Sequence, residues 1–501
     1  MTATADRVAT VMERWEAVIG IEIHCQLRTA SKMFCGCSTA YDGAAPNTHV
    51  CPVCLGLPGT LPTINRRAVE LVIETGLAIE AAIPERTQWE RKNYFYPDLP
   101  KGYQISQYAI PLAADGRLTV ETSDGPFTVL IRRAHLEEDT AKLVHGDAVR
   151  GGSGAGARSS LVDFNRSGAP LMEVVTEPVL RTAEQARRYA EELQVLLRAI
   201  GASDADMERG QMRVEANVSL RPRGEEPFGT RVEVKNMNSF RAVERAIAFE
   251  IERQARALEA GEALVMETRG WDDGTQSTYR MRAKETSEDY RYFPEPDLPP
   301  LHVEAAWIDR VRATVPELPA ARRARYGAMG ITAYDAAVIA ADPVMTGAFE
   351  ALTAAGAPAK ETSNFVTGPH APEVRATGPN AEGLAGHATA RDLAELLRAT
   401  VDGRVSRSVA RDLIAAHVAT GTPAPELLAS AGPGPISDDA TLIGHVDAVI
   451  VANPKALADH RAGRPVAGFL VGHVMKATGG AADATRVAAL VRERLDAAED
   501  G

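Results

Sequence analysis

The sequence lacks several features that would place it in common protein classes. It contains no run of about 18 or more apolar residues, so no membrane span is predicted. Its N-terminal stretch, MTATADRVATVMERWEA, has no uninterrupted apolar core of the kind that secretory signals carry, which favours a cytoplasmic location. There is no basic excess, because 55 Lys and Arg stand against 67 Asp and Glu. Any contact with nucleic acid must therefore come from local patches or from shape, since the net charge of −12 does not attract polyphosphate.

Cysteine is missing from the chain after residue 54. Four of the five cysteines form a C-x-C pair, Cys35 and Cys37, and a C-x-x-C pair, Cys51 and Cys54. In a reducing compartment such spacing favours a metal over disulfides. Four thiolates can close a tetrahedral zinc site with no open position, so the zinc would be structural. The alternative is four unligated thiols.

The pattern of apolar residues predicts an α+β fold with several domains. At about 100–200 residues per domain, 501 residues predict two to four domains. Strand-like and helix-like segments mix without strict alternation up to a proline-rich break at 292–300, and the chain beyond it has a helical pattern. A second glycine- and proline-rich break follows at 431–435. We therefore expect a mixed domain over residues 1–300, a helical domain over 301–429 and a small helical tail over 430–501.

Individual elements can be located in the first 300 residues. The pattern of apolar residues predicts strands at 18–27, 127–133, 170–176, 212–221 and 230–234. Apolar residues at three- and four-residue spacing predict long helices at 66–81, 183–200 and 242–260. The last two helices are each followed by a glycine, as helix ends often are.

The clearest candidate for chemistry is the predicted strand IGIEIHCQL, residues 19–27. Successive side chains of a strand point to opposite faces, so Glu22 and His24 share the polar face, whereas Cys25 faces the core as a buried thiol. A carboxylate and an imidazole on one strand face can bind one metal ion. A solvated outer face would have the same pattern.

Other polar segments leave two interpretations open. Glu173 interrupts an apolar strand and needs a partner, either a cation or a salt bridge. A further acidic cluster is HLEED at 135–139. Alternating polar positions at 213–221 and 231–235 describe either a wet sheet face or a polar substrate floor. The aromatic and basic segment 91–104 can stack on bases or pack as a loop.

Together these segments resemble the B subunit of the bacterial and organellar aspartyl/glutamyl-tRNA amidotransferases. The matching stretches are IGIEIHCQL, SKMFCGC, CPVCLGLPGTLP, RKNYFYPDLPKGYQISQY, HLEED, SLVDFNRSGAPLMEVVTEP, MRVEANVSLRP, EVKNMNSF, DYRYFPEPDLPPL and GFLVGHVMKATGG. They extend over roughly residues 16–495. The resemblance implies a mixed α/β cradle domain carrying a four-cysteine zinc knuckle at 35–54, then a helical domain, then a helical tail that binds tRNA.

The resemblance also implies a ligase that works in a heterotrimer with A and C subunits. The A subunit would release ammonia from glutamine, which fits the absence here of a glycine- and serine-rich amidase stretch. The B subunit would use ATP and Mg²⁺ to phosphorylate the side-chain carboxylate of Glu-tRNA(Gln), Asp-tRNA(Asn) or both. Ammonia would then displace phosphate. Phosphoryl transfer of this kind depends on positioning and on neutralisation of charge.

By the same resemblance, residues of this chain take site roles. The Mg²⁺ ligands, which are also the catalytic residues, would be Glu22, His24, Glu173 and one member of the Glu137–Glu138 pair, with Glu137 favoured. Residues expected to contact phosphate or acyl groups are Lys92, Lys142, Arg166, Asn217 and Lys235.

Two other classes compete with this interpretation. A non-catalytic tRNA-binding scaffold would not need acidic residues and histidine on polar strand faces. The archaeal E-subunit type carries an additional synthetase-like insertion, for which a continuous match over 501 residues leaves no room.

Overall fold

The computed structural model of the chain divides into two compact units, Met1–Leu318 and Pro319–Gly501. The residues that it describes are 11, 13–145, 160–283, 290–368, 384, 386–431, 436, 438–461, 464–479 and 482–497. No single helix in these ranges is both long and apolar enough to cross a membrane. Helices α7 (Ala333–Ala341) and α8 (Pro343–Ala354) reach that criterion only as a pair, and they bend by 114° where they meet.

The first unit is built on an eight-stranded mixed sheet in the order β13-β12-β11-β10-β1-β9-β6-β5. Every neighbouring pair is antiparallel except β11 and β12, which run parallel. The strands are β1 (Trp15–Gln26), β5 (Ala113–Thr122), β6 (Gly125–Glu138), β9 (Pro170–Thr176), β10 (Met212–Pro222), β11 (Val232–Met237), β12 (Glu267–Asp272) and β13 (Ser277–Ala283).

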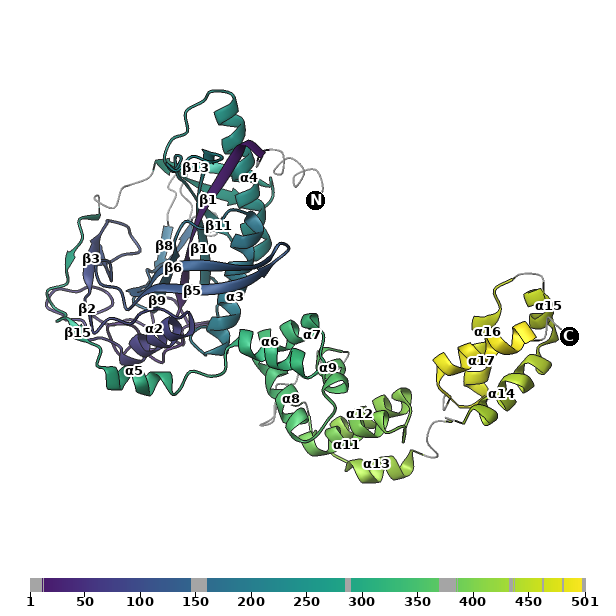
Figure 1. The fold of residues 1–501 in the computed structure, drawn as a ribbon. Coiled ribbons are helices and arrows are strands. Elements are labelled where there is room, and N and C mark those ends of the chain that lie inside the picture. The colour runs from purple at the N-terminus through teal and green to yellow at the C-terminus, as the bar shows by residue number, and fades with distance from the viewer. Residues whose placement is uncertain are drawn as a thin grey trace, which may run out of the picture. The chain divides into compact units, whose positions relative to one another are not determined.

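One face of this sheet is apolar because alternate residues of its central strands are apolar. Ile21 and Ile23 of β1 are fully buried, as are Ala216 and Val218 of β10. Two long helices, α3 (Ala183–Ala199) and α4 (Phe240–Glu259), lie side by side and pack against the sheet (Figure 1). The hydrophobic core of the first unit therefore sits between the helices and this face, and the other face is left to polar side chains.

Two further helices and three small sheets belong to the described part of the first unit. Helix α2 (Arg66–Ala78) packs on β5 and β6, and α5 (Ala305–Arg312) packs on α2. Because Trp307 of α5 donates a hydrogen bond to Glu70 of α2 at 3.1 Å, the unit continues past residue 300 to Leu318. The small sheets pair β14 (Phe293–Pro294) with β3 (Glu90–Asn93) and β4 (Tyr103–Ser106), β15 (Leu301–His302) with β2 (Arg86–Thr87), and β7 (Lys142–His145) with β8 (Ser160–Asp163).

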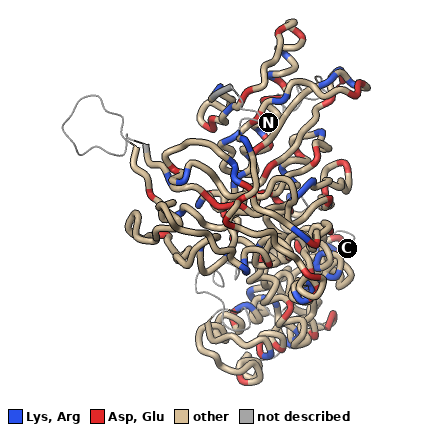
Figure 2. The backbone as a smooth tube through the Cα atoms, turned by 90° about the vertical axis from the view of Figure 1, so that its left-hand side faces the viewer, with Lys and Arg blue, Asp and Glu red and all other residues tan. Residues whose placement is uncertain are grey.

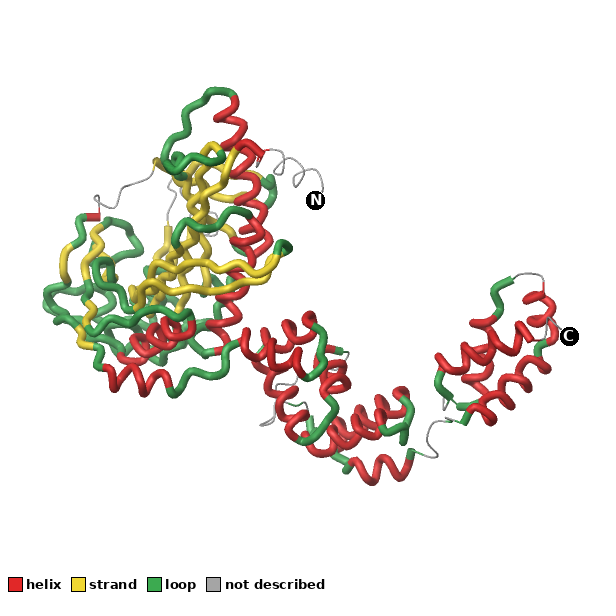
Figure 3. Tube along the Cα trace, in the orientation of Figure 1, coloured by secondary structure: helices red, strands yellow, loops and turns green. Residues whose placement is uncertain are grey.

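The described part of the second unit is helical (Figure 3). Besides α7 and α8, its helices are α6 (Pro319–Ala328), α9 (Ala359–Thr367), α11 (Ala390–Val401), α12 (Arg407–Thr420), α13 (Ala424–Ser430), α14 (Asp439–Ala452), α15 (Pro454–Arg461), α16 (Ala467–Ala477) and α17 (Ala484–Ala497). Their buried side chains form separate hydrophobic clusters, with one large cluster before residue 431 and another after residue 436.

The structure confirms the α+β class and the predicted elements. The strand predicted at 170–176 has the bounds of β9, and those predicted at 18–27 and 212–221 correspond to β1 and β10. The strand predicted at 230–234 begins two residues later, as β11. Residues 432–435 of the predicted second break lie outside the described residues. The three-domain division itself stays a prediction, which the separate clusters of the second unit support.

The capping box of α3 tests how much one local signal contributes to the fold. The Thr182 hydroxyl accepts a hydrogen bond from the Gln185 amide at 3.1 Å, and the Gln185 side chain accepts from the Thr182 amide at 3.3 Å. We expect Thr182→Ala to lower the free energy of unfolding by about 1 kcal/mol and Thr182→Ser to retain most of it. All four tryptophans precede Leu318, so denaturation followed by their fluorescence reports on the first unit alone. Equal stability of the two variants would contradict the prediction.

Candidate functional site

The polar face of the large sheet gathers ionisable side chains from five strands. In Figure 2 acidic and basic positions lie close together across the middle of the first unit. Strand β1 lies between β9 and β10, so its polar side chains meet those of both neighbours. Glu22 and His24, predicted to share this face, do so, and both are partly exposed beside the fully buried Ile23 and Cys25.

The first group on this face, here called the histidine–glutamate cluster, consists of His24, Glu137 and Glu173. Strand pairing places His24 of β1 directly opposite Glu173 of β9. The Nε2 atom of His24 lies 3.6 Å from a carboxylate oxygen of Glu137 and 3.6 Å from one of Glu173. On the other side, His135 of β6 is opposite Glu173, and its Nε2 atom lies 3.3 Å from the Glu173 carboxylate.

The second group, here called the triglutamate cluster, consists of Glu22, Glu215 and Glu233. Glu22 of β1 is directly opposite Glu215 of β10, and one carboxylate oxygen from each member lies within 4.8 Å of the others. The Asn217 side chain donates to Glu22 at 2.8 Å, and Lys235 Nζ lies 2.7 Å from Glu215. The structure thus brings together His24, Glu137 and Glu173 of the predicted ligand set but places Glu22 in the neighbouring cluster.

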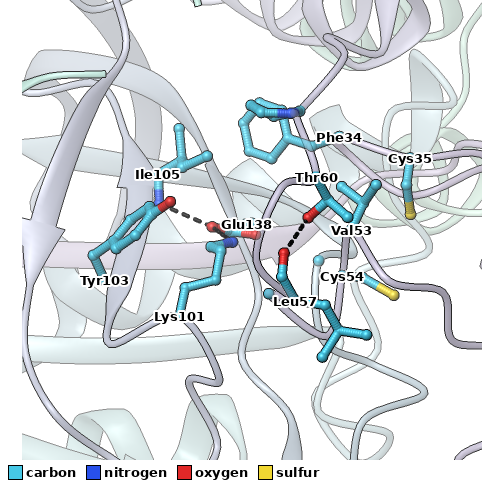
Figure 4. Close-up of a pocket in the computed structure, with 13 residues that line it drawn as sticks. Phe34, Cys35, Val53, Cys54, Leu57, Thr60, Lys101, Tyr103, Ile105 and Glu138 are labelled. Atoms are coloured by element: carbon cyan, nitrogen blue, oxygen red, sulfur yellow. Dashed lines mark hydrogen bonds and ion pairs between the residues drawn. The ribbon is translucent and has the colours of Figure 1, made fainter. Parts of the chain in front are cut away.

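The two adjacent glutamates at the end of β6 have different partners because successive strand residues face opposite ways. Glu137 joins the histidine–glutamate cluster. The Glu138 carboxylate forms an ion pair with Lys101 Nζ at 2.5 Å and accepts a hydrogen bond from the backbone amide of Ile105 at 3.0 Å. Between that pair and two of the cysteines, Cys35 and Cys54, lies a pocket of about 120 Å³, which Thr60 and Leu57 also line (Figure 4).

The histidine–glutamate cluster is electrostatically unbalanced. Burial, followed by repulsion from Glu173, raises the pKa of Glu137 to about 8. Burial also opposes ionisation of Glu173, but His135 and His24 hold its pKa well below the usual range. Burial lowers the pKa values of both histidines, although the nearby Glu173 carboxylate opposes this effect. One imidazole nitrogen and the carboxyl groups of Glu137 and Glu173 then converge on one point.

This arrangement fits a divalent cation. The ligand atoms of each cluster lie within 4.8 Å of one another. Octahedral Mg²⁺ with donors at about 2.1 Å requires spacings of roughly 3–4 Å, so small side-chain movements would suffice. A cation would also remove the repulsion between Glu137 and Glu173, which is the largest effect after burial on the pKa of Glu137.

A polar cavity of about 340 Å³ opens over both clusters. Lys92 reaches it from β3; burial alone would lower the pKa of this lysine, but Glu137, Tyr292 and Glu173 raise it above its ordinary value. The Lys92 ammonium lies 5.1 Å from the ring of Tyr290, and Tyr292 stacks on Tyr108 with ring centroids 4.4 Å apart. The cavity lining also includes Gln107, Arg132, Arg133, His135, Val175, Arg231 and Lys235.

Three of the residues expected to contact phosphate or acyl groups, Lys142, Arg166 and Asn217, are not among those that line the cavity. Lys142 is exposed on β7, opposite Asp163 of β8. Arg166 donates to the carbonyls of Thr140 and Ala141, both at 2.8 Å. Lys92 and Lys235 line the cavity. Asn217 reaches it indirectly, because its side chain donates a hydrogen bond to Glu22, which lines the cavity.

The four predicted zinc ligands lie together, here called the cysteine knuckle (Cys35, Cys37, Cys51, Cys54). Their sulfur atoms all lie within 4.8 Å of one another. A ZnS₄ centre with bonds of about 2.3 Å places its sulfurs about 3.8 Å apart, so the group fits zinc. A hydrogen bond from Cys35 lowers the pKa of Cys54 to about 4, although burial opposes this. Cys25 is buried on the apolar side of β1, where burial raises its pKa to about 12.

Sequence reasoning assigned no role to several residues of the site. His135, Glu215 and Glu233 belong to segments whose polar alternation was visible, but alternation does not reveal which strands are neighbours. Tyr290 and Tyr292 enter the cavity from a part of the chain with no strand or helix pattern of its own, and only the stretch DYRYFPEPDLPPL signalled them.

Comparison with known proteins identifies the family of the chain. A family model described as the GatB/GatE catalytic domain matches residues 17–309, which include most of the large sheet, and so defines the class of the first unit. A second model, the GatB domain, matches residues 347–495. The chain belongs to the family formed by the B subunits of the aspartyl/glutamyl-tRNA(Asn/Gln) amidotransferases.

The relatives match nearly the whole chain. The B subunit from Moorella thermoacetica is 48% identical over 483 residues, which cover 96% of this chain and 100% of the relative. The B subunit from a Roseiflexus species is 46% identical over 95% of this chain and 97% of the relative. The corresponding protein from a Synechocystis species is 46% identical over 96% of this chain and 97% of the relative.

The histidine–glutamate cluster makes a direct prediction about cation binding. Glu173→Gln keeps the size of the side chain but removes its charge, so we expect the affinity of the chain for Mn²⁺ to fall at least about tenfold. Glu121→Gln, on an exposed position of β5 in the same sheet, is the matched control and should bind Mn²⁺ as the wild type does. Electron paramagnetic resonance, which detects free Mn²⁺, measures the Mn²⁺ affinity of both variants. Unchanged binding by Glu173→Gln would show that the cluster does not hold the ion.

Proposed function

We propose that this chain is the subunit of a tRNA-dependent amidotransferase that activates the side-chain carboxylate of Glu-tRNA(Gln), Asp-tRNA(Asn) or both. The observation that carries the proposal is the cavity in which two carboxylate clusters and Lys92 converge on one sheet face. Relatives that are 44–48% identical over nearly their full length carry this substrate pair in their names. The enzyme class is a carbon–nitrogen ligase.

The chemistry requires activation because a carboxylate does not react with ammonia. One carboxylate oxygen of the aminoacyl group attacks the γ-phosphorus of ATP, the bond to the bridging oxygen breaks, and ADP leaves. Ammonia then attacks the acyl carbon, phosphate leaves with the electron pair of the carbon–oxygen bond, and one proton is released as the amide forms. Both steps gain from fixed positive charge and from exclusion of competing water.

The residues of the cavity supply that environment. Lys92 is fixed between its carboxylate neighbours and the ring of Tyr290, so its ammonium is held ready for a phosphate oxygen. Arg132, Arg133 and Arg231 add positive charge to the cavity lining. The histidine–glutamate and triglutamate clusters would each hold a Mg²⁺ ion, which when bound neutralises phosphate charge during transfer. Asn217 and Lys235 position the carboxylates of the triglutamate cluster.

The remaining parts of the proposal concern partners and setting. We propose a cytoplasmic heterotrimer in which an A subunit supplies ammonia from glutamine and a C subunit completes the complex. The cysteine knuckle would hold a structural zinc ion, since four thiolates leave no position for a substrate. The helical tail, residues 430–501, would bind tRNA by shape, because 10 Lys and Arg stand against 12 Asp and Glu from residue 401 onward.

Substitution of Lys92 separates catalysis from the alternative of a tRNA-binding scaffold. In the assembled heterotrimer we expect Lys92→Met to lower the single-turnover rate of amidation about 100-fold or more, because a fixed charge at the phosphate is lost. Glutaminase activity and tRNA affinity should remain. Lys360→Met, an exposed lysine of α9, is the control. Amidation at the wild-type rate by Lys92→Met would favour the scaffold.

Deletion of residues 432–501 tests the proposed role of the tail. This segment contains a hydrophobic cluster of its own, so its removal should leave the other clusters intact. We expect the Kd for tRNA to rise at least about tenfold, while single-turnover amidation at saturating tRNA keeps most of its rate. Filter binding and rapid quench measure the two quantities. An unchanged Kd for tRNA would assign the tail another role.

A further inference from the structure

Lys32 is a buried cation beside the cysteine knuckle. Its relative exposure is 0%, and it is among the largest fully buried side chains of the described residues. The ammonium donates to the Sγ atom of Cys54 at 3.4 Å and to the carbonyl oxygen of Phe164 at 3.3 Å. No carboxylate of the described residues lies within 4.0 Å of it, so the lysine has no conventional ion-pair partner there.

A lysine in this position needs an anion. Burying an unpaired ammonium costs far more than the hydrogen bond to one carbonyl returns, so such groups are paired or uncharged. The only anion-forming group that Lys32 contacts in the described structure is the Cys54 thiol. A neutral thiol is a weak acceptor, whereas a metal-bound thiolate is a strong one. Zinc with four thiolates has a formal charge of −2, which a neighbouring ammonium reduces to −1.

We propose that Lys32 is the charge-compensating residue of the cysteine knuckle, whose ammonium hydrogen-bonds the zinc-bound Cys54 thiolate and holds the knuckle against the turn before β9. This inference rests on the zinc occupancy put forward under the proposed function. Lys32 touches neither zinc nor substrate, so it acts as a positioning residue through Cys54.

The same lysine joins the knuckle to a strand of the functional site. Its second hydrogen bond ends on Phe164, in the turn that leads to β9 and hence to Glu173. Two further bonds join the same parts: the Ser167 hydroxyl donates to the Cys54 carbonyl at 3.4 Å, and the Met33 amide donates to the Gly168 carbonyl at 2.7 Å. Lys32 is the charged member of this set, so its bond is the one that depends on negative charge at the Cys54 sulfur.

Zinc affinity of full-length variants tests the proposal. Wild type, Lys32→Met and Lys32→Gln are loaded with zinc and titrated with a chromophoric chelator, with the exposed Lys360→Met as matched control. We expect one zinc ion per wild-type and control chain, and an affinity about 10–100-fold lower in Lys32→Met, as removal of a residue behind a metal ligand typically produces. Lys32→Gln keeps a hydrogen-bond donor but removes the charge. Its zinc affinity should therefore fall as far as that of Lys32→Met if the charge is responsible. Tryptophan fluorescence establishes that each variant is folded.

Thiol reactivity gives a readout that a merely structural lysine would not move. With zinc bound, loss of the ammonium should make Cys54 alkylate several-fold faster with iodoacetamide in Lys32→Gln. Cys37, whose carbonyl accepts a hydrogen bond from the Lys32 backbone amide and not from its ammonium, serves as the internal reference. Wild-type zinc affinity and wild-type Cys54 reactivity in Lys32→Gln would overturn the role of Lys32 but leave the proposed zinc site standing. A wild-type chain that binds no zinc would overturn both.

Discussion

The pairing of β1 with β9 and β10 is the constraint on which the site depends. His24 faces Glu173 across one side of β1, and Glu22 faces Glu215 across the other. Strand geometry alone brings these side chains within reach, because directly opposed residues have Cβ atoms only about 5 Å apart. The apolar residues between them hold that register, since a slip by one residue would turn Glu22 and His24 into the core under α3 and α4. The core therefore fixes the positions of the ionisable groups.

Charged groups on this sheet face are compensated by neighbouring groups of opposite charge, although the whole chain carries an excess of acidic residues. Lys92 compensates the histidine–glutamate cluster, Lys235 lies against Glu215, and Arg213 pairs with Asp139 at 3.1 Å. Each cluster nevertheless keeps more acidic than basic groups, which is the condition under which a protein site favours a divalent cation. Local compensation is also found at the cysteine knuckle, where the Lys32 ammonium donates a hydrogen bond to the sulfur of Cys54. A net charge of −12 says nothing about either arrangement.

Much of the fold was predictable from the sequence because its signals are local. Alternation located β1 and β10, an apolar run located β9, and Thr182 lies where a helix cap belongs. The site was less predictable because it depends on register. Glu22 and His24 are two residues apart on one face, yet they meet acids of different strands, and no periodicity in one segment reveals this. Arg166 was expected to contact phosphate or acyl groups, but a hydrogen-bonded turn holds it away from the cavity.

The most direct test of this account is the location of bound cations in crystals of the assembled complex grown with Mn²⁺ and a non-hydrolysable ATP analogue. An anomalous difference map should show one peak among His24, Glu137 and Glu173 and a second among Glu22, Glu215 and Glu233, with the γ-phosphate of the analogue near Lys92. Phosphate bound elsewhere on the chain, with no anomalous peak in either cluster, would contradict the claim that this sheet face performs the activation.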